Sequence, residues 1–192
     1  MLNVVLFGAP GCGKGTQSEL LEKKFGLSHI STGEIIRSHI KSQTELGKQM
    51  QEYISRGELA PDSVVIGMVE DYLGQNKGIK GTIFDGFPRT VKQAEILEDL
   101  FSRYELQLDG VVSLEVPEDV LIERMLERGK TSGRADDNIE SIHYRFVEYD
   151  SKTKPVLDFY QHRNCLHPIN GVGTIEEIFE NICETIDSIH NS

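Results

Sequence analysis

The first sixteen residues contain the clearest chemical pattern of the chain, an apolar run that ends in glycines and a lysine. Glycine occupies positions 8, 11, 13 and 15, Lys14 stands between the last two, and the first hydroxyl follows at Thr16. Glycines allow backbone N–H groups to approach a phosphate closely, and the lysine can reach the same anion. In the common phosphate-loop pattern a Ser or Thr directly follows the lysine, whereas here Gly15 does. The pattern therefore predicts a phosphate-binding loop of a variant form.

A carboxylate, Asp85, ends a predicted strand at residues 81–85. At the carboxyl end of a strand, Asp85 would approach the Mg²⁺ that accompanies a bound nucleotide, directly or through water. The Thr16 hydroxyl is a further candidate ligand for the same ion. An Asp-Gly pair is also common in turns, so the metal role depends on the presence of the phosphate loop.

Five of the nine arginines lie close to the expected loops at one end of the sheet: Arg89, Arg124, Arg128, Arg134 and Arg145. Arg124 and Arg128 are four residues apart and share one helix face. A single arginine is usually a solvated surface charge, but this grouping indicates a site for more than one phosphate. Phosphoryl transfer needs such cations, because charge develops between two anionic groups.

A regulatory GTPase would instead need a guanine-reading Asn-Lys-x-Asp motif. The pair Asn76-Lys77 continues as Gly78-Ile79 without the aspartate. The sequence therefore favours a transfer enzyme over a switch. The six histidines are scattered, and no role is predicted for them.

Strand-like and helix-like segments alternate along the chain, which predicts an α/β fold with a parallel sheet covered by helices on both faces. Ligands of such sheets bind at the carboxyl ends of the strands. The predicted strands are 2–7, 28–31, 81–85, 109–116 and a weak one at 165–170. The predicted helices are 13–24, 32–42, 44–55, 61–73, 89–103, 117–128, a long helix that begins at a capping-box-like Asp137 with Glu140, and a final helix capped by Thr174 with Glu177.

Composition limits the functional classes. The 192 residues suggest one domain, and the net charge of −11 argues against a nucleic-acid surface. No apolar run approaches the roughly 20 residues that span a bilayer, and the N-terminus lacks the basic leader of a signal peptide. Cys12, Cys165 and Cys183 fit neither a disulfide framework nor a zinc site, so reduced thiols in a cytoplasmic protein are expected.

Five segments carry a family resemblance: GAPGCGKGT, STGEIIRS, GELAPD, DGFPRTVKQ and ERGKTSGRADDN. In order and spacing they closely resemble adenylate kinases, within the nucleoside monophosphate (NMP) kinase family, over nearly the whole chain. In that family Gly-Thr follows the phosphate-loop lysine, as it does here. The resemblance implies a three-layer P-loop NTPase fold with a central five-stranded parallel sheet. It also implies a single domain, 1–192, with a core (1–30, 61–126 and 138–192), a helical NMP-binding region (31–60) and a short lid (127–137).

The reaction implied by the resemblance is reversible transfer of the γ-phosphoryl group of MgATP to AMP, giving two ADP. Because the acceptor is already an anionic phosphate, positioning and charge stabilisation act without a general base. The short lid lacks the insertion and the cysteines of zinc-containing relatives, so no structural zinc is expected, and the family suggests a monomer.

Two other functions stay open at this point. A UMP/CMP kinase is the closest alternative, although such relatives typically carry Ala and Asn where this chain has Thr32 and Gln93. A nucleotide sensor without turnover would be expected to lack Lys14 or some of the lid arginines, and this chain retains them.

Site residues follow from the matching motifs. The resemblance implies that ATP is bound by Gly11, Cys12, Gly13, Lys14, Gly15, Thr16, Arg124, Arg128 and Gly173. It implies that AMP is bound by Thr32, Arg37, Glu58, Leu59, Ala60, Gly86, Phe87, Pro88, Arg89, Gln93, Arg134 and Arg145. The implied catalytic residues are Lys14, Arg89, Arg124, Arg128, Arg134 and Arg145. Asp136 and Asp137 are expected to orient the lid arginines, and Phe87-Pro88 matches a cis peptide bond of the family.

Several assignments compete with simpler interpretations. Thr32 could be a helix cap, Arg37 a solvated helix charge and Gln93 an exposed helix residue. Cys12 is most simply a small residue that fills the loop. A thiol beside a helix N-terminus favours the thiolate, however, so a modest further hypothesis is that alkylation of Cys12 blocks ATP binding.

Overall fold

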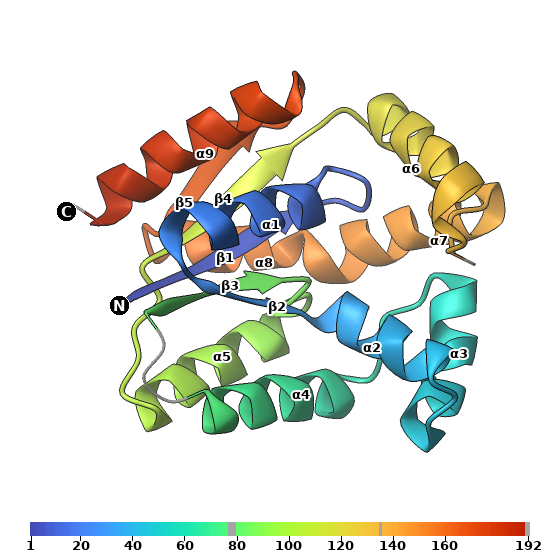
Figure 1. The fold of residues 1–192 in the computed structure, drawn as a ribbon, viewed down its shortest axis with the longest axis horizontal. Coiled ribbons are helices and arrows are strands. Elements are labelled where there is room, and N and C mark those ends of the chain that lie inside the picture. The colour runs from blue at the N-terminus through green and yellow to red at the C-terminus, as the bar shows by residue number, and fades with distance from the viewer. Residues whose placement is uncertain (77–79, 135, 191–192) are drawn as a thin grey trace.

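The computed structural model describes residues 1–76, 80–134 and 136–190 of the chain (Figure 1). Expectations that involve Lys77, Gly78 or Ile79, or Ala135 in the predicted lid, lie outside these residues. Within the described ranges, no helix has both the length and the apolar character needed to cross a bilayer.

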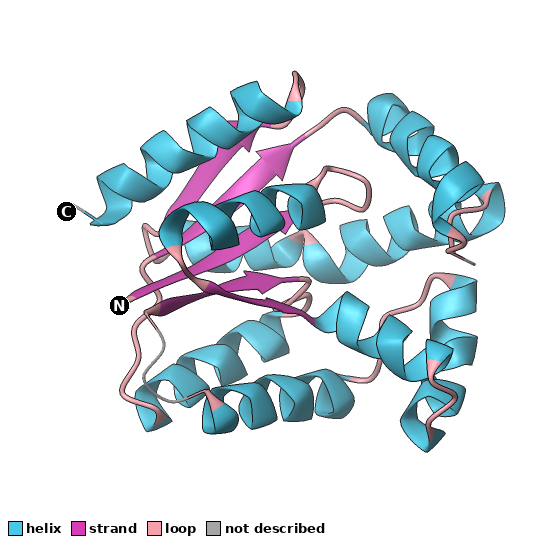
Figure 2. Cartoon of the chain, in the orientation of Figure 1, coloured by secondary structure: helices cyan, strands magenta, loops and turns pink. Residues whose placement is uncertain are grey.

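A five-stranded parallel sheet forms the centre of the molecule, as the sequence predicted. Its strands are β1 (Leu2–Gly8), β2 (Ser28–Ser31), β3 (Gly81–Asp85), β4 (Gly110–Glu115) and β5 (Leu166–Asn170). Their spatial order is β2-β3-β1-β4-β5, so β1 lies between β3 and β4. Because the strands are parallel, their carboxyl ends meet along one edge of the sheet (Figure 2).

Helices cover both faces of the sheet (Figure 1). They are α1 (Lys14–Phe25), α2 (Thr32–Lys41), α3 (Glu45–Arg56), α4 (Asp62–Gln75), α5 (Val91–Arg103), α6 (Glu118–Ser132), α7 (Ile139–Glu148), α8 (Pro155–Gln161) and α9 (Ile175–His190). Alternate side chains of β1 point to opposite faces. Val4 and Leu6 pack with α1, α6, α7 and α9. Val5 and Phe7 pack with α2, α3, α4, α5 and α8, which makes the sheet the middle of three layers.

The helix before the predicted lid is longer than expected. α6 continues past Arg128 to Ser132, and it ends at Gly133, whose φ of +64° lies in the left-handed region. Glycine adopts this conformation without a steric penalty and commonly terminates helices. The first part of the predicted lid is therefore helical.

The helix after the predicted lid begins and continues differently from the expectation. Its N-cap is Asn138, whose Oδ1 accepts a hydrogen bond from the Ser141 N–H at 3.0 Å, so the predicted cap at Asp137 is wrong. The carboxylate of Asp137 binds arginines instead. The predicted long helix is also interrupted, because a π-helical turn (Tyr149–Thr153) separates α7 from α8.

Candidate active site

A cavity of about 280 Å³ lies at the carboxyl ends of β1, β2 and β3. Most of the predicted site residues line it: Gly11, Gly13, Lys14, Gly15, Thr16, Thr32, Arg37, Glu58, Leu59, Ala60, Asp85, Gly86, Phe87, Pro88, Arg89, Gln93, Arg128, Arg134 and Arg145. Three predicted residues, all in the described part of the chain, lie outside the lining: Cys12, Arg124 and Gly173. The fold thus brings all of the predicted AMP-binding residues and most of the predicted ATP-binding residues to one cavity.

The loop between β1 and α1 has the form of a phosphate cradle. Gly11 and Gly13 have φ angles of +84° and +101°, which glycine adopts readily. α1 begins at Lys14, so the N–H groups and positive dipole end of this helix lie at the cavity. Lys14 Nζ donates to the carbonyl of Gly8 at 2.6 Å and to that of Ala9 at 3.1 Å. A bound phosphate would replace these carbonyls as the partner of the ammonium group.

Arg124 contacts the phosphate loop but does not line the cavity. Its guanidinium donates to the Gly171 carbonyl at 3.2 Å and to the Cys12 carbonyl at 3.4 Å. The contacts tie the phosphate loop to the loop after β5, which contains Gly173. Cys12 is 1% exposed, which matches its simpler interpretation as a small side chain that fills the loop.

The loop between β3 and α5 is organised around the Gly86 carbonyl. Thr32 Oγ1 donates to it at 2.9 Å and Arg89 Nε at 2.8 Å. A Cβ on Gly86, whose φ is +77°, would lie 2.7 Å from an Arg89 terminal nitrogen, so a side chain at this position would be strained and would displace the guanidinium. The cap interpretation of Thr32 is wrong, because Ser31 occupies the N-cap position of α2. The Phe87–Pro88 peptide bond is cis, as the resemblance implied.

Gln93 is a buried member of the cavity wall, with 1% of its surface exposed, so it is not an exposed helix residue. Its Oε1 accepts a hydrogen bond from the Arg89 N–H at 2.7 Å. Its Nε2 donates to Asp62 Oδ1, also at 2.7 Å. The backbone N–H of Gln93 bonds to the Thr90 hydroxyl, which caps α5. The amide is therefore held at both ends.

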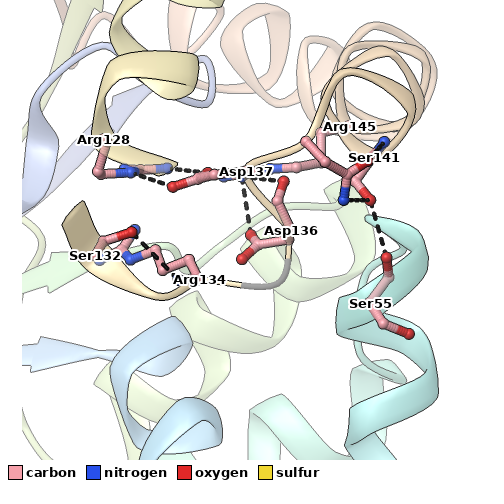
Figure 3. A network of polar contacts seen from close by, with 9 residues as sticks. Ser55, Arg128, Ser132, Arg134, Asp136, Asp137, Ser141 and Arg145 are labelled. Carbon is pink, nitrogen blue, oxygen red and sulfur yellow. Dashed lines mark hydrogen bonds and ion pairs between the residues drawn. The ribbon is translucent and has the colours of Figure 1, made fainter. Parts of the chain in front are cut away.

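Arg128 of the predicted lid and Arg145 of α7 meet at a pair of buried aspartates (Figure 3). Arg128 binds Asp137 through two parallel hydrogen bonds of 2.7 Å. A terminal nitrogen of Arg145 lies 2.8 Å from Asp136 Oδ2 and 3.1 Å from Asp137 Oδ1. Burial raises the pKa of Asp137, but the hydrogen bond and charge of Arg128 outweigh it and hold that pKa below its ordinary value. These contacts place both aspartates where they orient the arginines, as the sequence suggested.

Arg37, Arg89 and Arg145 are crowded and partly desolvated. Burial, with a further contribution from the charge of Arg134, lowers the pKa of Arg37 to about 10. Burial also lowers the pKa of Arg89, and burial with the charge of Arg128 lowers that of Arg145. All of them stay protonated at neutral pH. Arg37 is therefore no freely solvated helix charge, and an anion in the cavity would relieve the repulsion between these cations.

Asp85 lies at the end of β3, with 8% of its surface exposed. His29 Nε2, from the neighbouring β2, lies 3.7 Å from Asp85 Oδ2, and Ser31 Oγ donates to the same oxygen at 3.4 Å. Burial opposes both charges, but the mutual attraction is larger, so the pKa of His29 is raised and that of Asp85 is lowered. The charge of Lys14 lowers the pKa of Asp85 further.

Oxygen donors of this kind suit Mg²⁺. Asp85 and Thr16 line the same cavity, and a Cβ on Gly15 would lie 3.9 Å from Asp85 Oδ2, so the carboxylate is close to the phosphate loop. Within the described residues, no group of three or more His, Cys, Asp or Glu side chains could hold a metal ion. Asp85 and Thr16 together offer two oxygen donors that could hold Mg²⁺ in this cavity.

Comparison with known proteins identifies the family. The model of the family described as adenylate kinase matches residues 6–165. The chain belongs to the adenylate kinase family.

Similar proteins named adenylate kinase cover almost the whole chain. The one from Porphyromonas gingivalis is 51% identical over 187 residues, which are 97% of this chain and 96% of that protein. The one from Bacteroides thetaiotaomicron is 48% identical over 189 residues, 98% of this chain and 100% of that protein. The one from Flavobacterium psychrophilum is 45% identical over 190 residues, with the same coverage. Neither the UMP/CMP kinase nor the sensor alternative is favoured by these matches.

This adenylate kinase fold contains site residues that the sequence did not indicate. Glu148, Tyr149 and Thr153 line the cavity and belong to the end of α7 and the π-helical turn. A π-helical turn has no distinct hydrophobic period, so a pattern search cannot find it. The contact between His29 and Asp85 was missed because it joins two strands that are far apart in the sequence.

A second unexpected feature links the predicted NMP-binding region to α7 (Figure 3). Ser141 Oγ donates to the Ser55 carbonyl at 2.9 Å. Gly57, with a φ of +77°, packs so closely that a Cβ would lie 2.7 Å from the Ser141 carbonyl oxygen and 2.9 Å from Arg145 Cγ. The end of α3 is therefore packed directly on the arginine that the aspartates hold.

Proposed function

We propose that this cavity transfers the γ-phosphoryl group of MgATP to AMP, reversibly, to give two ADP. The observation that carries the proposal is the convergence of Lys14, Arg89, Arg128, Arg134 and Arg145 on one cavity beside a phosphate cradle. Residues 11–16 bind the ATP phosphates, and Arg124 and Gly173 also belong to the ATP side. The AMP side consists of Thr32, Arg37, residues 58–60, residues 86–89 and Gln93.

Catalysis in this proposal is electrostatic. The acceptor is a phosphate anion, so no base has to remove a proton, and the cations stabilise the charge that develops on the transferred group. Lys14 leaves the carbonyls of Gly8 and Ala9 and bridges donor and acceptor phosphates. Arg128 and Arg145 come pre-oriented by Asp137, which lowers the entropic cost of positioning them.

Asp85, through water, and the Thr16 hydroxyl would hold the magnesium ion that accompanies ATP. When bound, this ion neutralises phosphate charge. The lowered pKa of Asp85 supports the role, because it keeps the carboxylate ionised at neutral pH.

The setting of the reaction is also part of the proposal. The NMP-binding region, 31–60, and the short lid, 127–137, close over the substrates and exclude water. The enzyme acts as a cytoplasmic monomer on ATP, AMP and ADP, without nucleic acid or membrane. The free thiols of Cys12, Cys165 and Cys183 support a reducing compartment.

The test measures ADP formation from ATP with AMP, CMP, UMP or GMP as the acceptor. AMP should be strongly preferred, and Gln93→Asn should weaken that preference. Lys14→Met should lower kcat by about a hundredfold or more, as loss of a charge-stabilising donor does. The matched control is Lys48→Met, because Lys48 pairs with Glu45 on the exposed surface of α3. Equal rates for all four acceptors, or an active Lys14→Met, would contradict the proposal.

A further inference from the structure

Asp62 is not among the described residues that line the cavity, yet it contacts Gln93, which does line it. It is the first residue of α4, and its Oδ1 accepts a hydrogen bond from Gln93 Nε2 at 2.7 Å. The Thr90 hydroxyl donates to the same oxygen at 3.5 Å. Asp62 thus joins the start of α4 to the start of α5 and contacts the cavity wall through Gln93.

The orientation of the Gln93 amide follows from these contacts. A carboxylate only accepts hydrogen bonds, so the amino end of the amide must face Asp62. The Arg89 backbone N–H only donates, so the oxygen end must face Arg89 at 2.7 Å. Both partners require the same orientation. A flipped amide would set a donor against the Arg89 N–H and an oxygen against the carboxylate.

The amide keeps two unused hydrogen-bonding positions. It has two N–H donors and an oxygen with two lone pairs, and the described residues use one of each. One N–H and one lone pair remain for a ligand in the cavity. This pair complements a base edge that offers an amino donor next to a ring-nitrogen acceptor, as adenine does. A 6-oxopurine offers the reverse order, a carbonyl acceptor next to a ring N–H donor.

We propose that Asp62 is a positioning residue for base selection, which locks the Gln93 amide so that the pocket accepts 6-aminopurine monophosphates and rejects 6-oxopurine monophosphates. The inference rests on the proposed AMP pocket. IMP is the sharpest probe, because it differs from AMP only at the edge that the amide would contact. Rejection arises because a mismatched edge leaves buried polar groups unpaired.

The experiment compares kcat/KM for AMP and for IMP in Asp62→Ala and in the wild-type protein. A hydrogen bond to a charged group contributes about 1.5–3 kcal/mol, so the AMP:IMP ratio should fall by about tenfold to a hundredfold. KM for AMP should rise and KM for ATP should stay constant. Asp62→Asn keeps an acceptor oxygen and should restore most of the ratio. Asp71→Ala, which removes an exposed acid of the same helix, is the matched control.

A double mutant separates positioning from a structural effect. In a Gln93→Ala background, Asp62→Ala should leave the AMP:IMP ratio unchanged, whereas general damage to the pocket would lower activity further. If Asp62→Ala does not fold, Asp62→Ser replaces it, because a serine at this position is too short to reach Gln93. An unchanged ratio in the truncated variant overturns the inference. An unchanged ratio in Gln93→Ala alone would instead overturn the proposed AMP pocket.

Discussion

Replacing Asp137 with asparagine should destabilise the protein measurably, because this side chain holds two arginines. Its side chain is fully buried and accepts two hydrogen bonds of 2.7 Å from Arg128 and one of 3.1 Å from Arg145. Asparagine keeps the shape and one acceptor oxygen, but it removes the charge and turns an amino group toward a guanidinium.

The magnitude lies between two limits. Removing one partner of a buried ion pair costs about 3–5 kcal/mol, whereas an exposed pair contributes about 0–1 kcal/mol. The side chain of Arg128 is 32% exposed and Asp136 still binds Arg145, so hydration and the second aspartate offset part of the loss. We expect a decrease of about 2 kcal/mol in the free energy of unfolding, or about 4–8 °C in Tm for a chain of this size.

Thermal and urea unfolding at pH 7 provide the assay. The control is Asp150→Asn, because the Asp150 and Lys154 side chains are 63% and 65% exposed at a separation of 3.8 Å, and its effect should stay below about 0.5 kcal/mol. The pKa of Asp137 is lowered in the folded state, so its contribution is complete above the ordinary value of 3.8 and disappears as the pH falls through the folded pKa. The difference between wild type and Asp137→Asn should therefore shrink in acid. Equal stability at pH 7, or a difference independent of pH, would refute this reasoning.

Four further outcomes are expected. Gly57→Ala should destabilise by roughly 1–3 kcal/mol and raise KM for AMP, since its Cβ would meet the Ser141 carbonyl and its φ is +77°. Gly67→Ala lies within α4, and its Cβ would meet nothing within 4 Å, so it should stabilise the protein by about 0.5–1 kcal/mol. The unfolding midpoints of the two glycine variants test both expectations. Cys12 is 1% exposed, so it should react with iodoacetamide more slowly than the half-buried Cys165, as followed by mass spectrometry. Once Cys12 is modified, ATP binding should be blocked, and full activity after its modification would contradict this. A bisubstrate analogue should slow hydrogen exchange in residues 31–60 and around the lid, and exchange unchanged in both segments would argue against closure.

Local sequence patterns predicted much of this fold. Residues 81–85 form a strand whose Ile83 packs on one helical layer and Phe84 on the other, so the segment is buried on both faces. The phosphate loop could also be predicted from residue types alone. Its glycines are needed for backbone angles that other residues adopt at a cost, as the φ of +101° at Gly13 shows.

The hydrogen-bond and ion-pair partners of the polar side chains could not be predicted from local sequence patterns. Asp137 has the sequence context of a helix cap, but Arg128 and Arg145 lie within reach in the fold, and charge-assisted hydrogen bonds outweigh a cap. Gln93 looks like an ordinary helix residue until α4 brings Asp62, 31 residues away, to its amide. The hydrophobic periodicity of the sequence does not predict this contact, because it depends on where α4 and α5 begin relative to each other in space.

The sequence by itself determined the α/β class, the phosphate loop and the family, because these depend on residue types at short spacing. Only the tertiary structure decided which atoms of the site are already bound and which are free for a ligand. Lys14 donates to two backbone carbonyls, and Arg124 donates to the Gly171 carbonyl. Asp62 accepts a hydrogen bond from the amide of Gln93 and so orients it. The physical reason is that hydrogen bonds are short and directional, so they depend on convergence of segments far apart in the chain, which local propensity does not encode.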